Sequence, residues 1–201
     1  EHVMSERMQN IYPQLVMYAP EDESFDYKAV RNILNNSYSQ QIASLSPAHT
    51  KRVILQTKTT PATSAVSLKA IDPEKEETVS TLSEKIVQKT TLQNALKSNN
   101  IVIGKKLAKF HGLSVGDSAE LLFTNDNENN LKKADFTSTT VTIGGILDTG
   151  IMQYDKYMIV SSLDFSKHSL HDSDITLVGI KLKKGINDTL FMDELEKEFH
   201  I

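Results

Sequence analysis

The chain of 201 residues contains no cysteine, which excludes disulfide frameworks and thiolate metal sites but does not choose a cellular compartment. No apolar run approaches the roughly 20 residues that a membrane-spanning helix needs, and no signal peptide is visible. The first residue is Glu1 rather than Met. We therefore expect the chain to be an excised or processed piece of a longer protein, for example the segment between two membrane helices.

The charge balance is mildly acidic, with a formal net charge of -4 and a pI near 5.9. Such a balance makes nucleic-acid binding unfavoured, because nucleic-acid partners require a basic surface. The length is sufficient for one large domain or two small ones with a hydrophobic core. We therefore expect no nucleic-acid partner.

Apolar periodicity predicts helices near both chain ends and a strand-rich middle. The expected helices are 4–12, 25–36, 105–111 and 187–200, and the expected strands are 14–18, 52–56, 65–71, 101–103, 119–123, 136–147, 157–160 and 175–182. Asp26 is the expected N-cap of the second helix, and Gly112 the stop of the third. The charged block 74–81 is interpreted as a solvated connector, and 82–97 has a mixed pattern.

This order of elements is typical of an α+β fold with an insertion. We expect one mixed, porter-like lobe from 1–68 and 170–201, and an inserted β-rich lobe from 69–169. The helices 25–36 and 187–200 are expected to pack on the same sheet face of the first lobe.

Three short motifs contain some of the residues of a phosphate-binding, nucleophilic or metal site, but each lacks the rest of the arrangement that such a site needs. Gly104-Lys105 follows a strand as in a phosphate loop, but the upstream glycine and the following Ser or Thr are missing. Ser118 follows a Gly-Asp turn and is expected to open a strand facing water, without a histidine base. His168 and His171, near Asp172 and Asp174, are placed on a polar connector that does not order a metal site.

Asn187-Asp188-Thr189 matches a glycosylation acceptor, although Asn187 also suits a helix N-terminus, and we interpret it as a cap. Since no nucleophile, base and orienting group form a recognisable set, we predict no catalytic activity, no metal and no cofactor in this chain.

The candidate partner-binding site is the loop 124–135, where apolar periodicity is lost. Long polar loops of compact domains are often binding elements. Leu131 is the expected anchor, unless it is tucked against the flanking strands; a hairpin tip without a partner is the alternative. The residues of this site are Thr124, Asn125, Asp126, Asn127, Glu128, Asn129, Asn130, Leu131, Lys132, Lys133, Ala134 and Asp135.

Four segments together resemble the extracytoplasmic domain of MacB-type ABC-transporter permeases, closest to the lipoprotein-releasing subunits LolC and LolE. They are Ile11–Met17, Ala70–Pro73 (Gly-Ile-Asp-Pro in the family), Ile101–Ala108 with Gly116-Asp117, and Ile143–Thr149 with Tyr154-Asp155. In the last of these segments, Ile143–Thr149 is expected to form a strand and a glycine-pivoted corner. Tyr154-Asp155 is then expected to lie in the strand that returns from this corner.

The resemblance implies a periplasmic domain between two membrane helices of a bacterial inner-membrane permease, with both chain ends close together. It implies a partner permease subunit and ATP bound by a separate cytoplasmic ATPase. It also implies a lipoprotein substrate and a periplasmic lipoprotein carrier, which LolC hooks with a loop at the place of 124–140. That loop lacks proline here, unlike the hook of LolC. Two alternatives remain: a MacB-type exporter domain that binds a periplasmic adaptor, and an independent enzyme with an unrecognised site.

Overall fold

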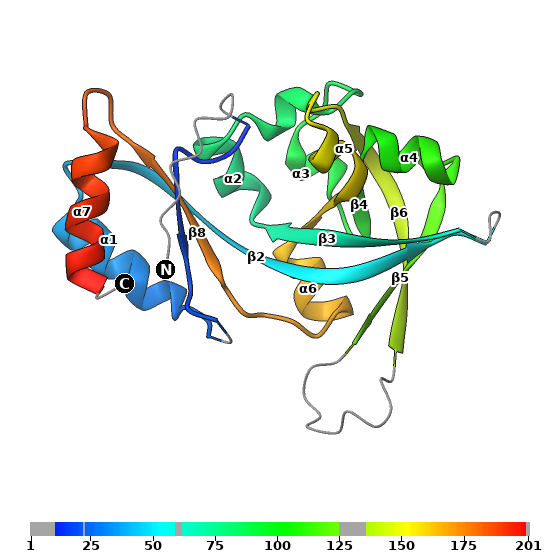
Figure 1. The fold of residues 1–201 in the computed structure, drawn as a ribbon, viewed down its shortest axis with the longest axis horizontal. Coiled ribbons are helices and arrows are strands. Elements are labelled where there is room, and N and C mark those ends of the chain that lie inside the picture. Colours follow the sequence, from blue (N-terminus) through cyan, green and yellow to red (C-terminus); the bar gives the residue numbers. More distant parts are fainter. Residues whose placement is uncertain (1–10, 22, 59–61, 125–135, 200–201) are drawn as a thin grey trace. The chain divides into compact units, whose positions relative to one another are not determined.

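The computed structural model describes residues 11–21, 23–58, 62–124 and 136–199, which form the expected α+β structure (Figure 1). The chain divides into two compact units. Unit 1 comprises Glu1–His49, Asp72–Leu82 and Asp174–Ile201, and unit 2 comprises Thr50–Ile71 and Ser83–Ser173. No helix among the described residues is both long and apolar enough to cross a bilayer.

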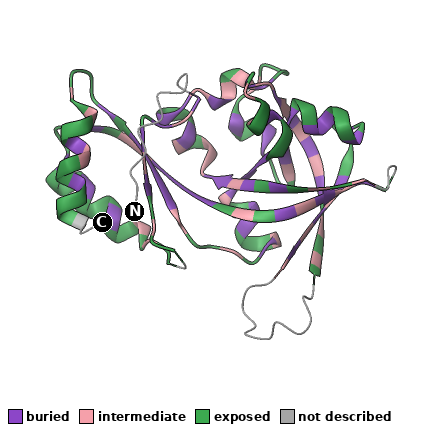
Figure 2. Cartoon of the chain, viewed as in Figure 1, coloured by how far each residue is buried: buried purple, intermediate pink, exposed green. Residues whose placement is uncertain are grey.

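Unit 1 is built on β1 (Leu15–Tyr18), β8 (Leu177–Leu182) and the first part of β2 (Ile42–Gln56). Strand β8 pairs antiparallel with both neighbours, so Ile180 lies opposite Leu15 on one side and Leu45 on the other. The buried side chains of these strands share one core with α1 (Tyr27–Ser37) and α7 (Asp188–Phe199). Figure 2 colours the buried residues of the chain purple, including those of these strands and helices.

Helices α1 and α7 of unit 1 begin where the sequence predicted. The Asp26 carboxylate accepts a hydrogen bond from the Ala29 N–H at 3.1 Å, and the Asn187 side chain accepts one from the Leu190 N–H at 3.1 Å. Tyr38, which follows α1, meets Phe191 of α7 edge-to-face at 5.4 Å between ring centroids. The predicted helix 4–12 lies almost wholly outside the described residues.

The charged block 74–81 is mostly helical, so the prediction of a solvated connector was wrong. Asp72 caps α2 (Pro73–Val79), and the proline occupies the first turn, where a missing N–H does no harm. Glu76 is fully buried and accepts hydrogen bonds from the hydroxyls of Ser46 at 2.8 Å and Ser80 at 3.3 Å. Because hydroxyl donors satisfy this carboxylate, one face of a charged helix can be buried.

Strand β2 begins ten residues before the predicted strand 52–56. Its first half contains Ser44, Ser46, Pro47 and His49, which interrupt the apolar alternation that marks a strand. Those residues belong to unit 1, whereas residues from Thr50 onward belong to unit 2. The unit boundaries fall inside β2 at 49/50, on either side of α2 at 71/72 and 82/83, and at 173/174.

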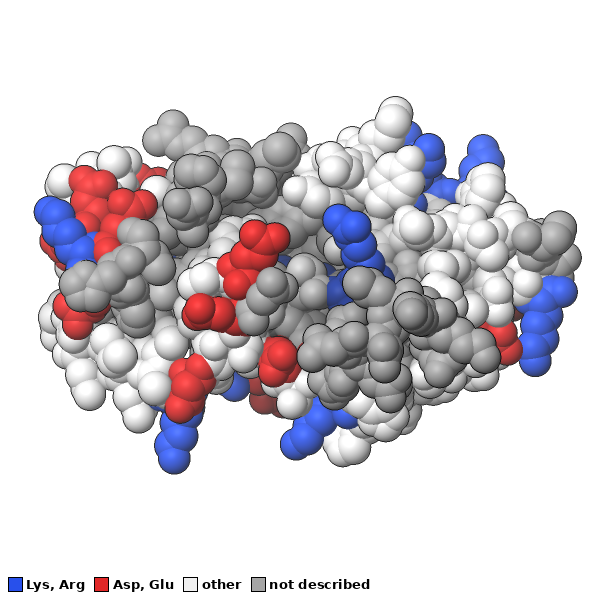
Figure 3. Space-filling model, turned by 60° about the horizontal axis from the view of Figure 1, so that its bottom comes forward, with Lys and Arg blue, Asp and Glu red and all other residues white. Residues whose placement is uncertain are grey.

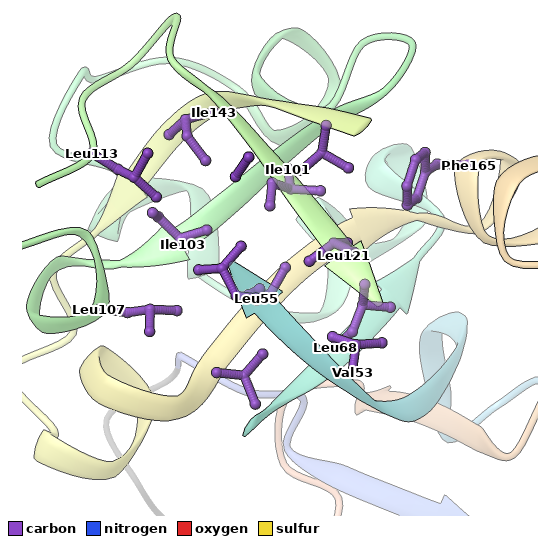
Figure 4. Packing of buried hydrophobic residues seen from close by; sticks show 14 of the residues in the cluster. Val53, Leu55, Leu68, Ile101, Ile103, Leu107, Leu113, Leu121, Ile143 and Phe165 are labelled. Carbon is purple, nitrogen blue, oxygen red and sulfur yellow. The ribbon is translucent and has the colours of Figure 1, made fainter. Parts of the chain in front are cut away.

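Unit 2 is a closed ring of strands in the order β2, β3, β7, β4, β6 and β5, completed by antiparallel pairing of β5 with β2. Its further strands are β3 (Thr63–Ile71), β4 (Asn100–Gly104), β5 (Ser118–Thr124), β6 (Phe136–Leu147) and β7 (Met158–Ser162). Figure 4 shows the interior, which branched side chains such as Leu55, Leu68, Ile103 and Leu121 fill.

Short helices lie between the strands of the ring in the sequence. They are the 3-10 helix Leu82–Lys85 and the α-helices α3 (Leu92–Ala95), α4 (Lys105–His111), α5 (Met152–Tyr157) and α6 (Leu163–Ser169). Helix α4 ends as predicted at Gly112, whose φ of 64° is in the left-handed region that glycine tolerates.

Tyr154 and Asp155 lie in α5, so the expected return strand at this place was wrong. The backbone N–H of Thr149 donates to Asp155 Oδ1 at 2.8 Å, and its hydroxyl donates to the same atom at 2.7 Å. Gly144 and Gly145 do not form a corner either, since both lie within β6, where its register with β4 shifts. A Cβ on Gly144 would overlap the Ala95 carbonyl, which explains the glycine.

Candidate partner-binding site

The predicted partner loop joins two strands of the ring. Strands β5 and β6 pair antiparallel from Ser118↔Thr142 outward to Thr124↔Phe136. Of the predicted site, the structure describes only Thr124, which is half-buried. Residues 125–135, including Leu131, lie outside the described residues, so their role stays a prediction. The ladder nevertheless fixes the two points between which the loop runs.

Phe136 is a candidate contact residue, whereas its sequence pattern predicts only a strand. Its side chain is 55% exposed at the base of the loop. The next four residues of β6 (Thr137, Ser138, Thr139 and Thr140) are small, polar and exposed or half-buried. A large exposed aromatic side chain can serve as an anchor in a protein interface. The sequence signal was available: Phe136 directly follows the polar loop.

The glycine of the phosphate-loop-like motif has a packing role. A Cβ on Gly104 would overlap the backbone carbonyl of Asp155, so only glycine lets α4 and α5 approach this closely. Lys105 Nζ lies 2.6 Å from Asp148 Oδ2, and this hydrogen bond and the attraction of the carboxylate raise the lysine pKa. Both features are accounted for without a phosphate ligand.

The other residues considered for a chemical site, Ser118, His168 and His171, do not form such a site in the structure. Ser118 is exposed at the start of β5, as expected. The ring of His168 in α6 hydrogen-bonds through Nδ1 to the Asp164 carbonyl at 2.8 Å, and His171 follows the helix with a φ of 55°. Within the described part of the chain, no group of three His, Cys, Asp or Glu side chains could hold a metal ion.

A Ser–His pair in unit 2 was not recognised in the sequence. Ser64 Oγ of β3 lies 2.8 Å from Nε2 of His111, which is buried at the end of α4. Burial lowers the pKa of His111, because desolvation disfavours the charged ring. Its Nδ1 has no hydrogen-bond partner among the described residues. The pair therefore lacks the third group that orients the histidine of a catalytic triad.

The sequence matches no protein-family profile and no curated protein. Solved structures with a similar fold include the extracellular domain of the noncanonic ABC-type transporter YknZ from Gram-positive bacteria. Its TM-score is 0.58 at 15% sequence identity, and the match covers 92% of this chain and 93% of that one.

A second similar structure is the periplasmic region of MacB from Actinobacillus actinomycetemcomitans. Its TM-score is 0.57 at 12% identity, with 92% of this chain and 80% of that one covered. At such identities the likeness concerns the fold, and it extends over nearly the whole sequence. The chain therefore has the fold of the extracytoplasmic domains of MacB-like ABC transporters.

Proposed function

We propose that this chain is the extracytoplasmic domain of an ABC-transporter permease, facing the periplasm or the outside of a bacterial cell. The observation that carries this proposal is the shared fold, which spans 92% of the chain with each of two such domains. Its role there is to contact a partner or substrate and to transmit conformational change, while ATP is hydrolysed by a separate cytoplasmic ATPase.

The chemistry of the described residues is consistent with a binding domain. The Ser64–His111 pair lacks an orienting group, and the described residues include no trio of metal ligands. We therefore infer that the domain acts through contacts rather than through a reaction. The β5–β6 hairpin, with Phe136 at its end and Leu131 in its loop, is the proposed place of those contacts.

Two finer roles agree equally well with this fold. In one, the permease releases lipoproteins from the inner membrane and the hairpin loop contacts a periplasmic lipoprotein carrier, as the resemblance to LolC and LolE implies. In the other, the permease belongs to a MacB-type exporter and the domain contacts a periplasmic adaptor. The similarity to the MacB periplasmic region concerns the fold alone, so it agrees with the second role without choosing between the two.

The location is tested on the full-length protein in its own membrane, with an epitope inserted between Asn129 and Asn130. An antibody should reach the epitope in spheroplasts and fail to reach it in sealed inside-out vesicles. An ABC-type ATPase should co-purify with the solubilised protein. An epitope accessible only from the cytoplasmic side would refute the proposal.

The partner is tested by binding purified lipoprotein carrier or adaptor to Leu131→Asp, with Asn129→Asp as the control that adds the same charge nearby. If Leu131 is an anchor, only Leu131→Asp should abolish binding, and the melting temperature should be unchanged, as expected for an exposed position. A lower melting temperature would instead show that Leu131 packs against the hairpin.

A further inference from the structure

The two units carry opposite net charges. Unit 1 contains 8 Lys and Arg against 16 Asp and Glu, a net charge of -8, whereas unit 2 contains 14 against 10, a net charge of +4. The excess in unit 2 is concentrated in one stretch: residues 85–116 contain six lysines and no Asp or Glu. A chain with a net charge of -4 thus presents a strongly basic segment around α3, β4 and α4.

Helix α4 presents the densest part of this segment. Leu107 and Ala108 are buried in the ring, so helical spacing turns Lys106, Lys109 and Phe110 to the outside. Phe110 is 63% exposed. Neither Lys106 nor Lys109 forms an ion pair with another residue that the structure describes. The basic face of α4, defined by these three residues, therefore combines unpaired charge with an exposed aromatic ring.

The backbone at the start of this helix is closely packed. Gly104, at the start of α4, contacts the backbone of Asp155 in α5, and Asp155 is fixed by two hydrogen bonds from Thr149. Figure 1 shows α4 and α5 together on one side of unit 2. A helix whose backbone is packed before binding loses little backbone conformational entropy when a partner docks.

Helix α7 of unit 1 presents the complementary pattern. Phe191 and Leu195 are buried, so helical spacing turns Leu190, Asp193 and Glu196 outward. Leu190 is 61% exposed. The helix contains five acidic residues and one base, Lys197. Acidic side chains are frequent over this part of unit 1, on the left of Figure 3. The acidic face of α7 is defined by Leu190, Asp193 and Glu196.

We propose that the basic face of α4 docks onto the acidic face of α7 on a second copy of this chain. Each face offers one exposed apolar side chain flanked by two charges, and the charges are of opposite sign. An anionic membrane is a poorer fit, because membrane-surface helices bury a continuous apolar face and the apolar residues of α4, Phe110 apart, are already inside the ring.

Two short helix faces form a small interface, so the contact is weak in solution and sensitive to salt. Under the proposed function, anchoring of two copies in one membrane would raise their effective concentration and make the weak contact effective. The contact itself does not need the membrane, and it can fail in solution without affecting the assignment as a permease domain.

The test is sedimentation velocity of the whole chain at increasing protein concentration, at low ionic strength and again at about 0.5 M salt, where the Debye length falls to a few Å. The wild type should self-associate at low salt and at least tenfold less strongly at high salt. The variant Lys106→Glu/Lys109→Glu should remain monomeric, and so should Asp193→Lys/Glu196→Lys.

Mixing the two charge-reversed variants decides the question. Each is expected to be monomeric alone, while the mixture should associate at low salt, because each variant then presents a face complementary to the other. A monomeric mixture, or a wild type that stays monomeric at low salt, would overturn the proposal. Binding of the wild type to phosphatidylglycerol vesicles without self-association would also overturn it and assign the face of α4 to a lipid surface. Melting curves confirm that each variant is folded.

Discussion

Gly104 lies against the backbone of Asp155 so closely that a methyl group on its α-carbon would overlap the Asp155 carbonyl. Gly104→Ala should therefore lower the free energy of unfolding by about 3 kcal/mol, because rigid backbone must move. Gly112→Ala is the matched control: its Cβ meets nothing within 4 Å, and only the left-handed φ costs about 1 kcal/mol. Urea unfolding measures both. Equal losses of unfolding free energy in the two variants would show that the backbone of α5 moves away from residue 104 at little cost.

Asp155 should matter far more to stability than Asp148, although both follow β6. Asp155 is buried and accepts two hydrogen bonds from Thr149, so Asp155→Ala leaves a buried N–H without its acceptor and should cost about 3 kcal/mol. Asp148→Ala removes an exposed ion pair with Lys105 and should have little effect. Thermal unfolding of the two variants compares them, and a similar effect of both would contradict the prediction.

Glu76 should be the indispensable member of the charged block 74–77. Glu76→Ala removes the acceptor of the Ser46 and Ser80 hydroxyls and leaves a cavity, for an expected loss of about 2–4 kcal/mol. Glu77→Ala, at an exposed position of the same helix, should change stability by less than about 0.5 kcal/mol. Chemical unfolding of both variants measures the difference, and a loss for Glu76→Ala as small as that for Glu77→Ala would refute the prediction.

The lowered pKa of His111 gives the fold a dependence on pH with a definite sign. Below the ordinary histidine pKa of about 6.5, His111 becomes protonated in the unfolded chain but stays neutral in the folded chain, where its pKa is lower. Stability from this group is therefore complete above that pH and falls on acidification, by at most about 1.4 kcal/mol per pH unit, until the folded state is also protonated. The wild type minus His111→Gln difference in unfolding free energy, measured from pH 8 to about pH 5, isolates the effect. A flat difference would contradict it.

The sequence predicted the elements whose signals are local. The Asp26 cap, the Gly112 stop and the apolar run before Gly104 each act within a few residues, and the structure confirms them. The predictions were wrong where contacts with residues distant in the sequence determine the local structure. Glu76 is helical and buried because Ser46, thirty residues earlier, satisfies its carboxylate.

The same limit applies to the candidate site. The sequence indicated the polar loop. Only the pairing of Phe136 with Thr124 across the hairpin places Phe136 at the base of that loop. Likewise, the Ser64–His111 pair joins residues 47 positions apart. The choice between lipoprotein release and a MacB-type exporter depends on partners that the fold does not specify, so both remain proposals.

The closed ring of unit 2 also has a consequence for folding speed. Parallel pairing of β3 with β7 places Ser67 beside Met158, and closure of the ring places Ile54 beside Leu122, so the defining contacts span long stretches of chain. Folding that depends on such non-local contacts is slow, in the range of milliseconds to seconds for small β-rich domains, because loop-closure entropy is lost before the contacts form. During that time the unpaired apolar strands are open to aggregation. A protein with this ring therefore exposes unpaired apolar strands for longer during folding than a protein whose contacts are mostly local.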